Sequence, residues 1–182
     1  MGQRFPALNE RHRRFIEQQK MFFVGTAAAA GRVNVSPKGG DYLRVLDRNR
    51  VVWLNLTGST NESSAHVQML DRMTIMFCSF DGEPLILRLF GHARVVHPRD
   101  AEWTELYAQF APNPGARQLF VMDIDLVQTS CGMAVPNYKY VAERVGLDEW
   151  AAKKSADAMV DYWREKNQLS LDNFPTNILE EE

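Results

Sequence analysis

Two short polar stretches, SPKGG at 36–40 and TGSTNESS at 57–64, contain residue types that bind phosphate groups. The first offers the Ser36 hydroxyl, the Lys38 cation and two glycines, whose backbone can approach a ligand closely. The second precedes an expected helix, where unpaired N–H groups and the helix dipole favour an anion. Neither stretch matches GxxxxGKS/T or GxGxxG. Each alone fits an ordinary turn, but together they indicate a site for a phosphorylated ligand.

The second stretch also has a structural interpretation. Ser59 and Glu62 have the spacing of a capping box, in which Ser59 is the N-cap and Glu62 bonds back to it. A carboxylate at Glu62 would repel a phosphate, so helix capping explains these two residues as well as ligand binding does.

Other reactive side chains give weaker signals. Arg88 interrupts the apolar run LILRLF, so it lies either on the outer face of a half-buried strand or against an anion. Cys131 could be a nucleophile, but no histidine lies nearby in sequence, and a small buried thiol is the more frequent case. None of the histidines has metal-ligand spacing; they are His12, His66, His92 and His97.

Alternating apolar residues predict the strands that must position these side chains. The predicted strands cover 21–29, 32–36, 42–46, 51–57, 72–80, 84–96 and 119–127. Short turns join most of them, which favours antiparallel pairing. Within 84–96, Gly91 indicates a bulge or a close approach by another backbone. In the strand 51–57 one face is aliphatic and the other becomes polar towards its end, as a ligand rim would.

Helices are expected to be few and peripheral. They are predicted for 6–20, for the segment after the capping box through Leu70, for the segment opened by Pro98, and for 147–166. Six or seven antiparallel strands with such helices favour a mainly β fold. A small closed or split barrel fits best because closure removes exposed sheet edges.

Composition limits the classes of function. The chain has 182 residues, 45% hydrophobic and 24% charged, which predicts one domain spanning 1–182. The net charge of −2 gives no general attraction to nucleic acid or anionic membrane. Two cysteines without CxxC spacing, and no signal-peptide or membrane-helix pattern, predict a cytoplasmic protein.

The order hairpin, VNVSPKG, WLNLTGS, NES-helix, MFCSF, LILRLFGHARVV resembles the pyridoxamine 5′-phosphate oxidase-like FMN-binding family. The motifs SPKG, TSCG and a C-terminal KN-x-x-S-x-D element, residues 166–172, resemble an uncharacterised bacterial branch of it. The resemblance covers 21–175. It implies an FMN-binding split barrel that forms a homodimer, with FMN at the subunit interface.

The resemblance also implies which residues hold the FMN phosphate. In such proteins they are polar residues at strand ends and at the following helix start, with an arginine from a barrel strand. Carried over to this sequence, the cofactor-binding residues are Ser36, Lys38, Asn55, Thr57, Ser59, Asn61, Ser63 and Arg88.

One feature departs from the family. Pyridoxamine phosphate oxidases carry an arginine-rich C-terminal element that grips the substrate phosphate, whereas residues 173–182 here are acidic. We therefore expect an FMN-dependent oxidoreductase of unknown small-molecule substrate and electron donor, rather than a pyridoxamine phosphate oxidase. Two alternatives stay open: a non-catalytic flavin-binding or sensing protein, and a split barrel that binds deazaflavin or haem.

Overall fold

A computed structural model describes residues 2–179 of the chain. The last glutamates of the acidic C-terminus, residues 180–182, lie outside the described residues.

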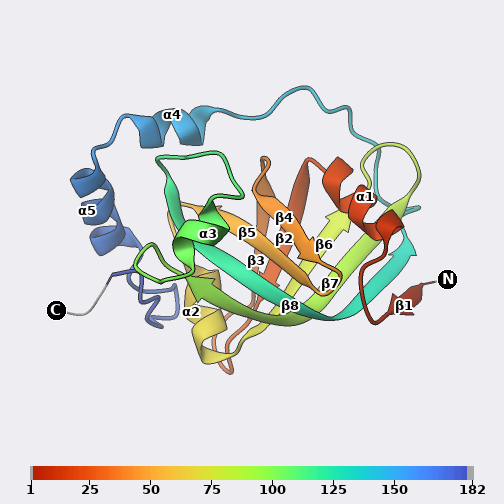
Figure 1. The fold of residues 1–182 in the computed structure, drawn as a ribbon, viewed down its shortest axis with the longest axis horizontal. Coiled ribbons are helices and arrows are strands. Elements are labelled where there is room, and N and C mark those ends of the chain that lie inside the picture. Colours follow the sequence, from red (N-terminus) through yellow and green to blue (C-terminus); the bar gives the residue numbers. More distant parts are fainter. Residues whose placement is uncertain (1, 180–182) are drawn as a thin grey trace.

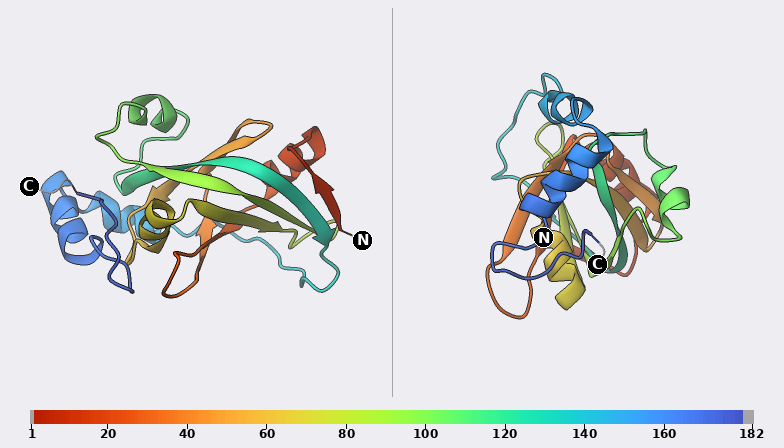
Figure 2. Two further views of the ribbon diagram at one scale, coloured as in Figure 1. Left: turned by 90° about the horizontal axis from the view of Figure 1, so that it is seen from below. Right: turned by 90° about the vertical axis from the view of Figure 1, so that its left-hand side faces the viewer.

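One antiparallel sheet organises the described residues. Its strands are β1 Gln3–Phe5, β2 Met21–Thr26, β3 Asn34–Gly39, β4 Leu43–Asp47, β5 Arg50–Leu56, β6 Arg72–Cys78, β7 Leu85–Val96 and β8 Ala116–Cys131. The order is β3-β2-β6-β7-β8-β5-β4, and β1 pairs with β8. The sheet curls strongly, with β3 and β4 at its two ends (Figures 1 and 2). The predicted mainly β, split-barrel fold is confirmed.

The helices are short and lie around the sheet (Figure 2). They are α1 Glu10–Gln18, α2 Glu62–Met69, α3 Trp103–Tyr107, α4 Gly146–Ala152 and α5 Ala156–Lys166. A long connection, residues 132–145, runs from the end of β8 past the other strands to α4 (Figure 1). Among the described residues, no helix is long and apolar enough to cross a membrane.

Apolar side chains pack on both faces of the sheet. The larger cluster fills the concave interior and includes Phe22, Trp53, Phe77 and Phe120, with the Trp53 and Phe120 rings stacked at 4.5 Å. A second cluster lies on the other face of β5 and β8, where α3 and neighbouring side chains cover it. Both faces of the strand predicted at 51–57 are therefore buried along most of its length, and the ligand rim is confined to its end.

The bulge predicted at Gly91 is confirmed. The register between β7 and β8 shifts between Phe90 and Gly91. A Cβ atom at Gly91 would lie 1.9 Å from the Asp123 carbonyl oxygen, so the neighbouring backbone occupies the space of a side chain.

Several predicted helix boundaries are wrong. The N-terminal helix begins at Glu10 rather than at residue 6, because Asn9 caps it there by accepting the His12 N–H with its side chain. The helix expected from Pro98 is the single turn α3. The helix predicted for 147–166 is broken into α4 and α5, because the Ser155 hydroxyl accepts the Ala158 N–H and caps a new helix start.

Candidate functional site

Polar side chains from β3 line one end of the barrel interior. Ser36 and Lys38 lie opposite Val24 and Phe22 of β2 in the antiparallel register. Because directly opposite residues share a face, these side chains point to the same side as the core residues Val24 and Phe22. Strand β3 is therefore apolar on its outer face and polar on its inner face.

A hydrogen-bond chain connects these side chains to α2. The Ser36 hydroxyl donates to Asn34 Oδ1 at 2.9 Å, and Asn34 Nδ2 donates to the Ser63 hydroxyl at 3.2 Å. Asn34 Nδ2 also lies 3.3 Å from the Thr26 hydroxyl, which contacts His66 Nδ1 at 3.2 Å. We call Asn34, Ser36, Lys38, Asn55 and Ser63 the polar cluster.

Lys38 supplies a positive charge to the polar cluster. Its Nζ donates to Asn55 Oδ1 at 3.4 Å and lies 5.2 Å from the Trp53 ring centroid. Burial first, and the nearby Arg117 second, lower the pKa of Lys38 to about 8. Lys38 is thus a half-buried cation, and the nearby charge of Arg117 has the same sign.

Arg117, which the sequence pattern did not indicate, is a second cation near the polar cluster, and it is buried. Its side chain is 2% exposed, and Nη1 donates to the Thr60 carbonyl at 3.0 Å and to Asn167 Oδ1 at 2.8 Å. Burial lowers the pKa of Arg117 to about 10. Within residues 2–179, neither Lys38 nor Arg117 forms an ion pair with a carboxylate.

The loop before α2 borders the polar cluster, but its predicted capping box is wrong. The helix begins at Glu62, and its N-cap Asn61 makes no side-chain capping bond. Asn61 instead exchanges two amide hydrogen bonds with Gln118 of β8, at 2.7 and 3.2 Å. Glu62 Oε1 accepts the Leu171 N–H at 2.9 Å. Tertiary partners therefore occupy both side chains and leave the first N–H groups of α2 without side-chain acceptors.

Three other predicted residues do not join the polar cluster. Thr57 is fully buried, donates to the Gly115 carbonyl and accepts the Trp163 indole N–H. Ser59 is exposed in the loop. Arg88 lies on the opposite face of the sheet, where it donates to the Ser130 hydroxyl at 3.0 Å.

Buried polar atoms near the polar cluster lack partners. Trp53 Nε1 and His66 Nε2 are buried and have no hydrogen-bond partner in the part of the chain that the structure describes, although such atoms are normally paired. Both belong to residues that contact the polar cluster or its hydrogen-bond chain. Together with two unpaired cations, they fit a site built for a polar, anionic ligand.

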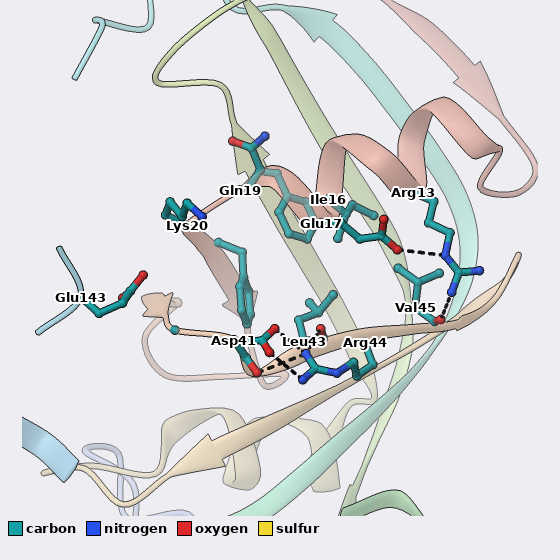
Figure 3. A pocket seen from close by; sticks show the side chains of 13 residues that line it. Arg13, Ile16, Glu17, Gln19, Lys20, Asp41, Leu43, Arg44, Val45 and Glu143 are labelled. Carbon is teal, nitrogen blue, oxygen red and sulfur yellow. Dashed lines mark hydrogen bonds and ion pairs between the residues drawn. The ribbon is translucent and has the colours of Figure 1, made fainter. Parts of the chain in front are cut away.

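A separate cavity opens between α1 and β4 and has a volume of about 610 Å³ (Figure 3). Four of its charged residues form two ion pairs, Arg13 with Glu17 and Arg44 with Asp41, and the remaining two, Lys20 and Glu143, have opposite charges. None of the predicted cofactor residues lines it. The cavity therefore offers room for a small molecule, but no uncompensated charge comparable to that at the polar cluster.

Comparisons with known proteins agree with the fold. The family model described as pyridoxamine 5′-phosphate oxidase matches residues 8–131. The pyridoxamine 5′-phosphate oxidase family protein ustO of Aspergillus flavus is 36% identical over 137 residues, which cover 72% of this chain and 55% of that protein. The chain thus matches about half the length of this relative.

Solved structures resemble the chain at low sequence identity. A HupZ variant from Group A Streptococcus has a TM-score of 0.56 and 16% identity, covering 67% of this chain and 98% of that one. HutZ of Vibrio cholerae, described as a haem storage protein, has a TM-score of 0.51 and 17% identity, covering 69% and 97%. At these identities the likeness shows the fold alone.

Proposed function

Because this chain belongs to the pyridoxamine 5′-phosphate oxidase family, we propose that it is a flavoprotein whose polar cluster holds the phosphate of FMN. The observation that carries this proposal is the pair of cations formed by the half-buried Lys38 and the buried Arg117, neither of which has a carboxylate partner in the described residues. A buried charge is costly unless it is paired. A dianionic phosphate is the counter-charge that this pair lacks.

The polar cluster has donors suited to phosphate oxygens. Lys38 uses one long hydrogen bond to Asn55, which leaves ammonium donors for a ligand. The Ser63 hydroxyl accepts from Asn34, so its own proton is free to point elsewhere. The first-turn N–H groups of α2 add neutral donors and a favourable dipole. Asn34 contacts both hydroxyls, since its Oδ1 accepts from Ser36 and its Nδ2 donates to Ser63.

The proposed activity is that of an oxidoreductase. FMN supplies the electron-transfer chemistry when it is bound, and the protein's contribution is binding, orientation and the local field. Positive charge at Lys38 and Arg117 holds the anionic end of the cofactor, while the Trp53 and Phe120 pair closes the barrel interior behind it. We assign no substrate and no electron donor.

We also propose that two copies associate through the outer face of the sheet. Apolar side chains are exposed there on β3, and Val35 is 67% exposed. Exposed apolar side chains on one face favour association with another chain.

The histidines favour a flavin over haem. His92 is exposed, but both ring nitrogens contact carboxylates, Asp71 at 2.9 Å and Asp125 at 3.1 Å. The rings of the remaining histidines are buried, namely His12, His66 and His97. A haem ligand would require one of them to break contacts or to open the core.

The experiment is to purify the protein, remove small molecules, and titrate it with FMN, deazaflavin and haem. We expect FMN uptake at one site per chain, with flavin absorbance at about 450 nm. Failure to bind FMN, or a Soret band on adding haem with no flavin uptake, would overturn the proposal. Turnover with NADH or NADPH and a panel of acceptors separates an oxidoreductase from a non-catalytic flavin-binding protein.

A further inference from the structure

The C-terminal segment 167–178, here called the strap, contacts the segments that border the polar cluster. It follows α5 and contains most of the KN-x-x-S-x-D element. It lies beside α2 and the β2–β3 hairpin (Figures 1 and 2). The proposed binding of FMN gives this element no direct contact with the cofactor.

Asn167 connects the strap to both the loop and the buried arginine. Its side chain is fully buried, Nδ2 donates to the Gly58 carbonyl at 3.0 Å, and Oδ1 accepts from Arg117 at 2.8 Å. The same Arg117 nitrogen donates to the Thr60 carbonyl at 3.0 Å. One amide therefore fixes the loop backbone and a cation of the proposed site in a single arrangement.

Asp172 connects the strap to the β2–β3 hairpin. Its Oδ2 accepts the Arg32 backbone N–H at 2.6 Å, and its Oδ1 pairs with the Arg32 guanidinium. These contacts lower the pKa of Asp172. Gly31, the residue before Arg32, has a φ of +85°, and a Cβ atom there would collide with the Asp172 carboxylate. The hairpin held in this way leads into Asn34 of the polar cluster.

Contacts with α2 complete the attachment. Glu62 accepts the Leu171 N–H at 2.9 Å. The Ser64 hydroxyl and Gln68 Nε2 both donate to the Thr176 carbonyl, at 2.8 and 2.7 Å. The strap thus joins the hairpin, the loop 58–62 and α2, which supply Asn34, the Thr60 carbonyl and Ser63.

We propose that the strap is a positioning element of the anion site: its docking places Arg117 and the loop 58–62, and a bound phosphate in turn holds the strap in place. The identity of the occupant as FMN rests on the proposed function. Because coupling between two events is reciprocal, loosening the strap must weaken the ligand by the same factor by which the ligand tightens the strap.

The test compares Asp172→Asn with the control Asp161→Asn. Asp161 forms an exposed ion pair with Arg164 within α5 and contacts no other segment in the hydrogen bonds described. We expect Asp172→Asn to speed amide hydrogen exchange in the strap and in loop 58–62 of the ligand-free protein. It should also raise the Kd for FMN by about fivefold or more. Asp161→Asn should change neither, and FMN should slow exchange in the wild-type strap.

A second variant, Asn167→Asp, guards against a merely structural effect. The new carboxylate still accepts from Arg117 but no longer donates to the Gly58 carbonyl, and its negative charge compensates the charge of Arg117. FMN affinity should therefore fall even if the variant unfolds at the wild-type denaturant midpoint. Unchanged FMN affinity in both strap variants, or faster strap exchange without weaker binding, would overturn the inference.

The inference and the proposed function fail separately. If the wild-type protein does not bind FMN, the proposed function is wrong, and inorganic phosphate becomes the probe. Protection of the strap by phosphate would then support the coupling with a different occupant. Absence of protection by phosphate would overturn the coupling as well.

Discussion

Lys38 and Arg117 place two positive charges where water reaches them poorly. The hydrogen bonds that stabilise these charges in the described residues all go to neutral acceptors. Lys38 donates to Asn55, and Arg117 donates to the Thr60 carbonyl and to Asn167. Neutral partners compensate a buried charge less well than an opposite charge does. The ligand-free fold therefore carries an electrostatic cost that an anion would relieve. This cost lowers the pKa of both residues.

Anion affinity should depend on pH through Lys38. The pKa of the free amine is lowered to about 8, and a bound phosphate should raise it because opposite charge favours the protonated form. From pH 7 upwards, where the phosphate is largely dianionic, binding should change little up to about pH 8 and weaken above it, by up to about tenfold per pH unit. The measurement is the Kd for FMN from pH 7 to 10. Lys38→Arg should remove the dependence and keep binding, whereas a wild-type Kd that stays constant up to pH 10 would contradict the role of Lys38.

His97 makes the fold sensitive to acid. Its ring is 5% exposed with Nδ1 unpaired, and burial, followed by the charge of Arg99, lowers its pKa to about 4. The unfolded chain takes up this proton near pH 6.5, so stability falls as the pH drops from about 6.5 towards 4. Urea denaturation should show that His97→Gln reduces the loss between about pH 7 and pH 5, by up to about 2 kcal/mol.

His92 provides the opposite control. Its exposed ring contacts Asp71, which raises its pKa. Its contribution is therefore present below about pH 6.5 and is lost as the pH rises through the folded value. His92→Gln should leave the acid-side loss caused by His97 in place, and an equal effect of both variants would contradict this assignment.

At the level of elements, local signals predicted the strands better than the helix starts. Gly91 and the alternating residues around it predicted a bulged strand, because the pattern depends on neighbours in the same strand. The capping box failed because Asn61 and Glu62 are held by Gln118 and Leu171, which are 57 and 109 residues away. Nothing in the local spacing reports such partners.

The sequence also identified those site residues whose role shows in a local pattern, and missed the one whose role depends on distant partners. Ser36, Lys38 and Asn55 stand out as polar residues among alternating apolar ones in strands. Arg117 does not, because its role depends on contacts with Thr60 and Asn167, each 50 or more residues away. The polar residues at strand ends can therefore be predicted from the sequence as site residues. The distant segment that contacts them is identified only from the folded structure.

The bulge in β7 should be intolerant of a side chain. Gly91→Ala would force the Cβ against the Asp123 carbonyl, which belongs to a paired backbone and cannot rotate away. We expect a loss of roughly 1–3 kcal/mol, as for overpacking in a core. Gly25→Ala is the matched strand control, since its Cβ would meet its nearest atoms at 3.8 Å. Equal denaturation midpoints for the two variants would contradict the steric explanation.

For the whole molecule, the surface that we propose as the interface between two copies is the outer face of the sheet. Val35 lies opposite Gly25, which lies opposite Thr74 and then Phe90 in successive antiparallel pairs. Opposite residues share a face, so these side chains form a row across four strands on the side away from the barrel interior. Strand β3, at the sheet's end, leaves one side without a backbone partner.

Association through this face should be sensitive to one charge. Val35 is 67% exposed, so Val35→Asp should leave the fold intact while placing a carboxylate in the proposed interface. Analytical ultracentrifugation should find the wild-type chain as a dimer and the variant shifted towards monomer. Leu171→Asp is the matched control because Leu171 is also 67% exposed but lies on the strap, and it should remain dimeric. A monomeric wild-type protein would contradict the proposed dimer, and a dimer unaffected by Val35→Asp would show that its interface lies elsewhere.

FMN affinity should fall on dilution of the protein only if the second copy of the dimer contributes to the anion site. The FMN titration at two protein concentrations therefore decides whether one barrel is sufficient for binding.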